Sequence, residues 1–341
     1  MRRTVSRSTA AISCLLVVAS LNAARRPRYG GTLRIDVSEA ISSLDPADVP
    51  ADPFEAALRE NIMREVGPFH VAAWEPRKAV VLEANDQFAA GRPYLDRVEI
   101  HMGRSLHDQA LDRALGKADV VELSLSDVRR VQQRDGRLSE SDPCLVIALA
   151  FGGHRADLDR MREAITRAID RSAIQNVLLQ KQGDISGALL PQWLSGYAFL
   201  FPTARDLGKA KELAASSPPL SFSWDSQSSL LKSIAERIVV DAAEAGIALR
   251  PATGPQADVR LVMLRIASED AGEALRTLGG TASTDPSKLF EAERALMESR
   301  RLAPLFHLPV VYELSPGVNA WTTGRTGNWR LEDVWLGAAR P

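Results

Sequence analysis

Cysteine is almost missing from this 341-residue chain, which has two, Cys14 and Cys144. Cys14 lies in an apolar stretch near the start of the sequence, so a chain that loses this stretch keeps Cys144 alone. One cysteine cannot form an internal disulfide, and no spacing typical of a structural metal site surrounds it. We therefore expect Cys144 to be a small packed side chain.

Net charge is almost missing too. The chain has 42 Lys and Arg against 43 Asp and Glu, a formal net charge of -1. A nucleic-acid-binding domain usually carries a basic surface, so we expect no nucleic-acid partner. With 45% hydrophobic and 25% charged residues the composition is typical of a soluble globular protein, and the length allows two domains.

A hydrophobic run long enough to cross a membrane, about 20 residues, is also missing. The apolar run AAISCLLVVASL has 12 residues, follows an arginine-rich start and precedes the small residues Ala23 and Ala24. This three-part pattern predicts a cleaved signal peptide over residues 1–24 and a periplasmic or otherwise extracytoplasmic location. An uncleaved membrane anchor is the alternative interpretation.

Motifs of the common enzyme classes are absent as well. The sequence has no nucleophile elbow, no phosphate-binding loop and no Cys-x-x-Cys pair. His101, His107 and Asp108 could contribute to a metal site, but solvated polar faces explain them better because no further ligands lie nearby in the sequence. We therefore expect a protein that is not an enzyme and that needs no metal and no cofactor.

The chain does contain a regular alternation of strand and helix patterns. The stretch GGTLRIDVS places Leu33, Ile35 and Val37 on one face, and DPCLVIALAF has the apolar character of a buried strand. Residues 156–179 and 226–245 carry apolar side chains at helical spacing. The alternation continues without an internal repeat, which predicts an α/β fold in two lobes.

Several segments, taken in order, carry a family resemblance. GPFHVAAWEPRKAVVLEANDQFAAGRPYLDRVEIHM resembles the extracytoplasmic solute-binding proteins of family 5, the dipeptide, oligopeptide and nickel receptors of ABC importers. RYGGTLRIDVSEAISSLDPAD is similar to the family's opening strand, and RMREAITRAIDRSAIQNVLL to its helix pair around Ala168 and Ile169. Next to these, Asp170 and Arg171 are expected to form an ion pair at a helix junction.

The resemblance implies a type II periplasmic-binding-protein fold with discontinuous lobes joined by a hinge. Lobe one would combine residues 27–146 with 306–341, lobe two would span 147–305, and the chain would cross near Ala150 and Leu305. Such a protein binds a peptide or similar small polar solute between the lobes and delivers it to an ABC permease in the membrane. We expect it to be a monomer without a cofactor.

Two segments depart from the family pattern. Only about 20 residues separate Pro46 from Gly67, where relatives carry a small extra domain, so we expect one short helix there. The Trp-x-x-Asp stretch, which helps relatives hold a polar end of the ligand, has no counterpart in LRIASEDAGEALRTLGGTASTDP. These departures leave open an alternative, a degenerate receptor-fold protein that acts as an interaction or sensing module without transport.

The expected ligand contacts come from the lobe crossover and from aromatic side chains. We predict six ligand-binding residues: Phe151, Gly152, Trp193, Tyr197, Trp224 and Trp321. Phe151 and Gly152 end a buried strand at the predicted crossover, where the resemblance implies a cleft. Trp193 and Tyr197 lie in the irregular stretch LLPQWLSGYAF and are expected to line the groove between the lobes. Each aromatic residue could instead be a half-buried structural side chain.

Overall fold

A computed structural model describes residues 26–152, 157–197, 202–215, 218–254, 256–299 and 301–337. The predicted signal peptide, residues 1–24, lies outside this range and stays a prediction. In the described part of the chain, every helix is too short or too polar to cross a membrane.

Helices and strands alternate along the described chain, as predicted. The helices are α2 (Pro53–Arg64), α3 (Leu106–Ala114), α4 (Leu125–Gln133), α5 (Leu158–Ala168), α6 (Arg171–Val177), α7 (Gln192–Ser195), α8 (Leu207–Ala214), α9 (Ser229–Glu244), α10 (Ala271–Thr277) and α11 (Pro286–Ser299). The strands are β1 (Thr32–Asp36), β2 (Phe69–Glu75), β3 (Ala79–Ala84), β4 (Arg97–His101), β5 (Val120–Glu122), β6 (Arg137–Glu140), β7 (Leu145–Phe151), β8 (Asp184–Ile185), β9 (Leu220–Trp224), β10 (Leu249–Pro251), β11 (Val259–Arg265), β12 (Leu302–Leu308), β13 (Val311–Leu314), β14 (Val318–Asn319) and β15 (Trp335–Leu336).

The first sheet has the strand order β2-β3-β4-β1-β5-β13-β6. Its centre is parallel, because β1 pairs in the same direction with β4 and with β5. Leu33 and Ile35 of β1 are fully buried and pair with the buried Val98 and Ile100 of β4. The alternation that predicted these strands therefore marks the face of the sheet that packs into the core.

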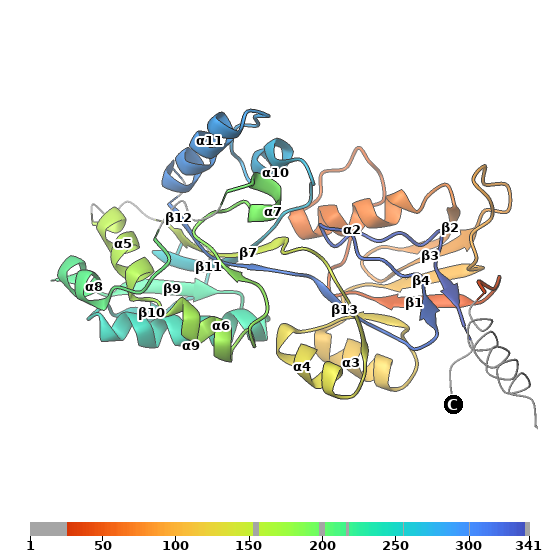
Figure 1. Ribbon diagram of the computed structural model, residues 1–341, viewed down its shortest axis with the longest axis horizontal. Helices are drawn as coiled ribbons and strands as arrows, with labels where there is room; N and C mark the ends of the chain where they lie inside the picture. Colours follow the sequence, from red (N-terminus) through yellow and green to blue (C-terminus); the bar gives the residue numbers. More distant parts are fainter. Residues whose placement is uncertain are drawn as a thin grey trace, which may run out of the picture.

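The second sheet has the strand order β10-β9-β11-β7-β12-β8. Strand β7 lies between β11 and β12 and is antiparallel to both, whereas β9, β10 and β11 are parallel to one another. Helices α5, α8 and α9 lie on one side of this sheet, and α7, α10 and α11 lie on the other (Figure 1). Because both faces are covered, β7 is buried from Val146 to Phe151, as its uninterrupted apolar sequence predicts.

The described chain crosses between these two sheets twice, and β14 and β15 pair with each other in a separate two-stranded sheet. The first change falls in residues 141–144, between β6 and β7, and the second at Pro309 and Val310, between β12 and β13. The predicted crossing points, Ala150 and Leu305, lie inside β7 and β12, so the sheets change several residues away from them. Movement of the two parts about these connections stays a prediction.

The apolar core is divided differently from the sheets. One cluster joins side chains of the first sheet with Leu189 and Leu190 and with α10 and α11, which cover the second sheet. The other cluster joins the opposite face of the second sheet with α5, α8 and α9, and also with Leu125 and Val128 of α4 and Val311 of β13. Apolar packing therefore runs across the boundary between the sheets in both clusters, which restricts independent motion of the two parts.

The predicted helix over residues 156–179 is two helices, with 153–156 outside the described residues. Helix α5 ends at Ala168 because Ile169 is extended, and the Asp170 carboxylate begins α6 by accepting a hydrogen bond of 2.8 Å from the Ala173 amide. The predicted Asp170–Arg171 ion pair is wrong, because Asp170 caps its own helix with Oδ1 and its Oδ2 lies 4.0 Å from Nη1 of Arg205, its partner in an ion pair. Arg171 instead donates to the Thr203 carbonyl at 2.8 Å.

The short connection between β1 and β2 forms one helix, α2, as predicted. Asp52 caps it by accepting hydrogen bonds from the amides of Phe54 at 2.7 Å and Glu55 at 2.9 Å, and Pro53 occupies the first helical position. Both residue types favour a helix start at these positions. This helix supplies several of the side chains described next.

Candidate functional site

A cleft of about 1110 Å³ lies between the two sheets. One wall is formed by the residues that follow β1, β4 and β5, and by α2. The other wall is formed by the end of β9, the start of α9 and much of β11. Open α/β sheets bind their ligands beyond the carboxyl ends of parallel strands, and ligand pockets typically measure roughly 300–1000 Å³. Position and size therefore mark this cleft as the candidate site.

Four helices begin at the cleft. Their N-cap residues, Asp52, Ser105, Ser124 and Ser228, all line it. Ser228, for example, accepts a hydrogen bond of 3.2 Å from the Leu231 amide with its hydroxyl. The positive ends of four helix dipoles consequently face the same space.

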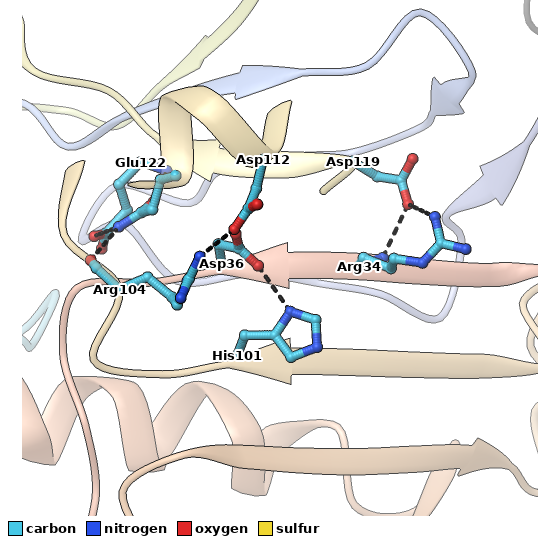
Figure 2. A network of polar contacts seen from close by, with 8 residues as sticks. Arg34, Asp36, His101, Arg104, Asp112, Asp119 and Glu122 are labelled. Atoms are coloured by element: carbon cyan, nitrogen blue, oxygen red, sulfur yellow. Dashed lines mark hydrogen bonds and ion pairs between the residues drawn. The ribbon is translucent and has the colours of Figure 1, made fainter. Parts of the chain in front are cut away.

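A polar network lies along the carboxyl ends of the central strands of the first sheet (Figure 2). Asp36, at the end of β1, is buried and lies 2.9 Å from Nδ1 of His101, at the end of β4. This contact raises the pKa of His101, because the Asp36 carboxylate favours the protonated ring. Arg104 forms a hydrogen-bonded ion pair with Asp112 of α3, so one arginine at the cleft is already neutralised.

Carboxylates gather on the wall formed by the first sheet. Glu122 is held by Ser38, whose amide donates to Oε2 at 2.7 Å, and by Gln109. Glu39 has no cationic partner among the described residues and accepts only from the Ala40 amide at 3.1 Å. Burial raises the pKa of Glu39, and the negative charges of Asp52 and Glu122 raise it further. This wall is therefore acidic and lacks a compensating cation at Glu39.

The aromatic side chains of the cleft come from distant parts of the chain: Phe54, Trp224, Tyr312 and Trp329. Tyr312 and Trp329 form a fixed pair, because Nε1 of Trp329 donates to the Tyr312 hydroxyl at 3.1 Å. Of these four, only Trp224 was predicted from the sequence to bind ligand. The family resemblance predicted that residues 306–341 return to lobe one, but it did not indicate that Tyr312 and Trp329 reach the cleft.

Of the six predicted ligand-binding residues, Trp224 lines the cleft and the other five do not. Phe151 is 4% exposed and packs in the core beneath α5, because it is the last residue of the buried strand β7. The Gly152 amide donates to the Asp258 carbonyl at 3.0 Å and so continues the contact between β7 and β11. Trp321 is 8% exposed and packs against Tyr312 and Trp329.

Trp193 and Tyr197 also lie away from the cleft, contrary to the expectation from the sequence. Nε1 of Trp193 donates to the Pro143 carbonyl at 2.8 Å, and the Arg325 guanidinium lies 4.2 Å from the centre of its ring. Tyr197 donates to the buried Glu293. Both side chains are half-buried by these contacts, which point them into the protein. Their role in solute binding stays a prediction.

Two sheets with a cleft between them, joined by two connections, define a type II periplasmic-binding-protein fold. The sequence model of bacterial extracellular solute-binding proteins, family 5 Middle, matches residues 27–290. The chain therefore belongs to family 5 of the bacterial extracellular solute-binding proteins, a family of receptors of ABC importers.

Individual relatives agree with this assignment. The chain is 25% identical to the oligopeptide-binding protein AppA of Bacillus subtilis over 146 residues, 42% of this chain and 26% of AppA. It thus matches about a quarter of the length of that curated relative.

Solved structures show the same fold. NikA of Brucella suis, in complex with Fe(III)-EDTA, has a TM-score of 0.67 at 16% identity, over 79% of this chain and 68% of NikA. A dipeptide-binding protein of Pseudoalteromonas sp. SM9913, in complex with Met-Leu, has a TM-score of 0.65 at 16% identity. This match covers 83% of the present chain and 68% of the dipeptide-binding protein. CtaP of Listeria monocytogenes has a TM-score of 0.64 at 16% identity, and the chain covers 66% of its length.

Proposed function

We propose that this protein is the extracytoplasmic receptor of an ABC importer and that it binds a peptide or similar small polar solute in the cleft. The cleft itself carries the proposal, since both sheets contribute side chains to one space of about 1110 Å³. Export by the predicted signal peptide would place the protein where such a solute is captured.

One edge of β11 favours a peptide. Strand β11 pairs with β7 along its whole length, but with β9 only from Val259 to Leu261. Beyond Leu261 no strand of the described chain pairs with this edge, and Val262 and Met263 line the cleft there. An extended peptide can hydrogen-bond to an open strand edge through its main chain. AppA, by its name, binds oligopeptides, and the Pseudoalteromonas relative holds Met-Leu.

Transport requires that binding change the receptor. A solute that contacts both walls favours the closed arrangement, because only that arrangement provides contacts from both sheets at once. The connections at residues 141–144 and at Pro309 and Val310 are where the backbone would change. A membrane permease would then recognise the closed form.

Mass spectrometry of the native protein, purified from the extracytoplasmic fraction, tests the proposal. We expect bound peptides of a few residues that are released on denaturation. Protein that carries no solute and binds none from a peptide pool, but that holds a stable protein partner, would contradict a transport role and support the interaction module. The same sample should begin near Ala24 or Arg25, whereas an intact Met1 would indicate an anchor.

A further inference from the structure

Another cavity, of about 340 Å³, lies at the end of the first sheet that faces away from the cleft. It is formed by the C-terminal ends of α3 and α4, the turn between α4 and β6, and the end of β13. Strand β5 runs toward the cleft, because Glu122 at its end lines the cleft, and β13 is antiparallel to β5. Leu314, the last residue of β13, therefore lies at the opposite end of the sheet, and no described residue lines both spaces.

Positive charge is in excess in this cavity. Three arginines line it, Arg113, Arg134 and Arg137, and we call it the arginine pocket. Two carboxylates, Glu313 and Asp135, also line it, which leaves one positive charge in excess. Glu313 is 6% exposed, whereas Asp135 is exposed and forms no ion pair with any described residue.

Glu313 engages only part of the two arginines that contact it. Nη2 of Arg134 lies 2.7 Å from both carboxylate oxygens, and this single nitrogen makes the contact. Nε of Arg113 lies 3.7 Å from Oε1 of Glu313, which is too long for a hydrogen bond, and it is enclosed without an acceptor. Arg113 donates through Nη2 to the Leu314 carbonyl at 3.1 Å. Both guanidinium groups thus keep N–H groups that have no acceptor among the described residues.

Arg137 is held in place by neutral groups. Its Nη1 donates to the Val318 carbonyl and lies 3.4 Å from the Pro316 carbonyl oxygen. No carboxylate of the described chain forms an ion pair with it, so its charge is not compensated. Its other nitrogens have no acceptor among the described residues, and a ligand that supplies one gains affinity there.

The turn between α4 and β6 brings Arg134 and Arg137 to the pocket. Asp135 has φ +54°, and the Gly136 amide donates to the Val131 carbonyl at 2.9 Å. A Cβ atom at position 136 would lie 2.3 Å from Cγ1 of Val131, so this tight turn requires glycine. Its closure places Arg137 at the start of β6, three residues after Arg134 at the end of α4.

We propose that the arginine pocket binds a phosphate or a similar tetrahedral oxyanion. Guanidinium groups from α3, α4 and β6 meet at one space, and a tetrahedral anion offers enough oxygens to accept from all three. The phosphate is either free or part of a lipid headgroup, since both present the same oxygens. This site lies outside the cleft and does not depend on the proposed function.

Titration of inorganic phosphate into the full-length protein by calorimetry tests the proposal. The wild type should bind phosphate, and Arg137→Gln should bind it about 10- to 100-fold more weakly, because charge-assisted hydrogen bonds are lost. Asp135→Asn removes the repelling charge and keeps a residue type that tolerates the left-handed backbone, so it should bind phosphate about 3- to 10-fold more tightly. Arg129→Gln is the control, because Arg129 is an exposed arginine of α4 that does not line the pocket.

Cosedimentation with lipid vesicles distinguishes the two sources of the phosphate group. Vesicles of phosphatidylglycerol are compared with vesicles of phosphatidylcholine. Sedimentation with phosphatidylglycerol that inorganic phosphate displaces and that Arg137→Gln loses identifies a lipid headgroup. Phosphate binding in calorimetry without sedimentation identifies the free anion.

Three results would overturn the arginine pocket as a binding site. The first is a wild type that binds neither phosphate nor phosphatidylglycerol, and the second is equal phosphate affinity in Arg137→Gln and the wild type. The third is an unchanged phosphate affinity in Asp135→Asn, which carries its substitution at an exposed position and serves where Arg137→Gln does not fold. Each would leave the arginines the structural role of compensating Glu313.

Discussion

The hydroxyl of Tyr197 donates a hydrogen bond of 2.6 Å to Oε2 of Glu293 in helix α11. Glu293 is 0% exposed, and its other oxygen accepts from the amides of Leu189 at 2.5 Å and Leu190 at 2.8 Å. One buried carboxylate therefore fixes the segment before and after α7 onto α11. This bond, together with the edge-to-face contact of Tyr197 with Phe290, accounts for the position of Tyr197 outside the cleft.

Tyr197→Phe tests whether this contact is structural. The substitution keeps the ring and removes one donor from an enclosed carboxylate, so the free energy of unfolding should fall by about 1–3 kcal/mol. Urea unfolding measures this fall, and calorimetry with alanine di- to tetrapeptides should show unchanged affinity. If stability is unchanged and peptide binding weakens, Tyr197 contacts the solute, as the sequence predicted.

Strands were predictable because their information is local. Val98 and Ile100 alternate with polar residues in the sequence, and the same alternation separates buried from partly exposed side chains in β4. Apolar spacing alone continues through the helix break at Ile169, and only the family resemblance predicted a helix pair there. The break depends instead on the Asp170 side chain, which bonds to the backbone of α6.

The cleft was harder to predict because its members are far apart in sequence. Glu39, Trp224, Arg260 and Trp329 come from four separate segments, and only the topology brings them to one space. Arg260 looks like the polar position of an ordinary strand. Its place in the cleft depends on the pairing of β11 with β7 and β9, which no local pattern predicts.

Trp193 contacts the connection between the sheets. Its indole N–H donates to Pro143, and Arg325, which covers its ring, also bonds to Asp142 through Nε at 2.6 Å. Trp193→Phe keeps an aromatic ring and removes the hydrogen bond, so the free energy of unfolding should fall by about 1 kcal/mol, measured by urea unfolding. If stability is unchanged and peptide affinity falls, Trp193 contacts the solute as first expected.

Glu65 should make stability depend on pH. It is 3% exposed at the end of α2, and both its oxygens lie 3.2 Å from the Leu331 amide. Burial raises the pKa of Glu65 from 4.5 to about 7, despite the bond from Leu331. The folded protein thus favours the protonated form of Glu65 more than the unfolded chain does. The resulting contribution to the free energy of unfolding is fully present below about pH 4.5 and is lost as the pH rises through about 7.

Glu65→Gln removes the charge at every pH and measures this contribution. We compare the free energy of unfolding of Glu65→Gln with that of the wild type, measured by urea unfolding at about pH 4.5 and at pH 8. The difference in favour of the variant should be about 3 kcal/mol larger at pH 8 than at pH 4.5. Glu60→Gln is the control, because Glu60 lies on the same helix with a half-exposed side chain paired to Arg64. An advantage that does not grow with pH would show that Glu65 titrates normally.

Two glycines with similar backbone angles should differ in their response to alanine. Gly183 has φ +69° and Gly196 has φ +79°, so a side chain is strained at both. A Cβ atom at Gly183 would lie 2.3 Å from the His307 carbonyl oxygen, whereas at Gly196 nothing lies within 4 Å. Gly196→Ala should cost about 1–2 kcal/mol of unfolding free energy, and Gly183→Ala about 1–3 kcal/mol more. Equal losses in thermal or urea unfolding would show that β12 moves aside easily.

Trp224 provides the most direct test of the cleft. It ends β9, is half-buried, and lines the cleft with its ring 5.4 Å from that of Phe222. An aromatic face offers contact area at low entropy cost, so Trp224→Ala should weaken binding of the alanine peptides about 5- to 150-fold in calorimetry. Trp74→Ala is the matched control, because Trp74 is a half-buried tryptophan of β2 that does not line the cleft.

The two variants should lose comparable stability, since each exposes part of a core that a half-buried tryptophan covers. Their difference in peptide affinity then reports the cleft alone. Equal affinity in Trp224→Ala and the wild type, with binding retained by both, would place the solute against the first sheet, beyond the reach of β9.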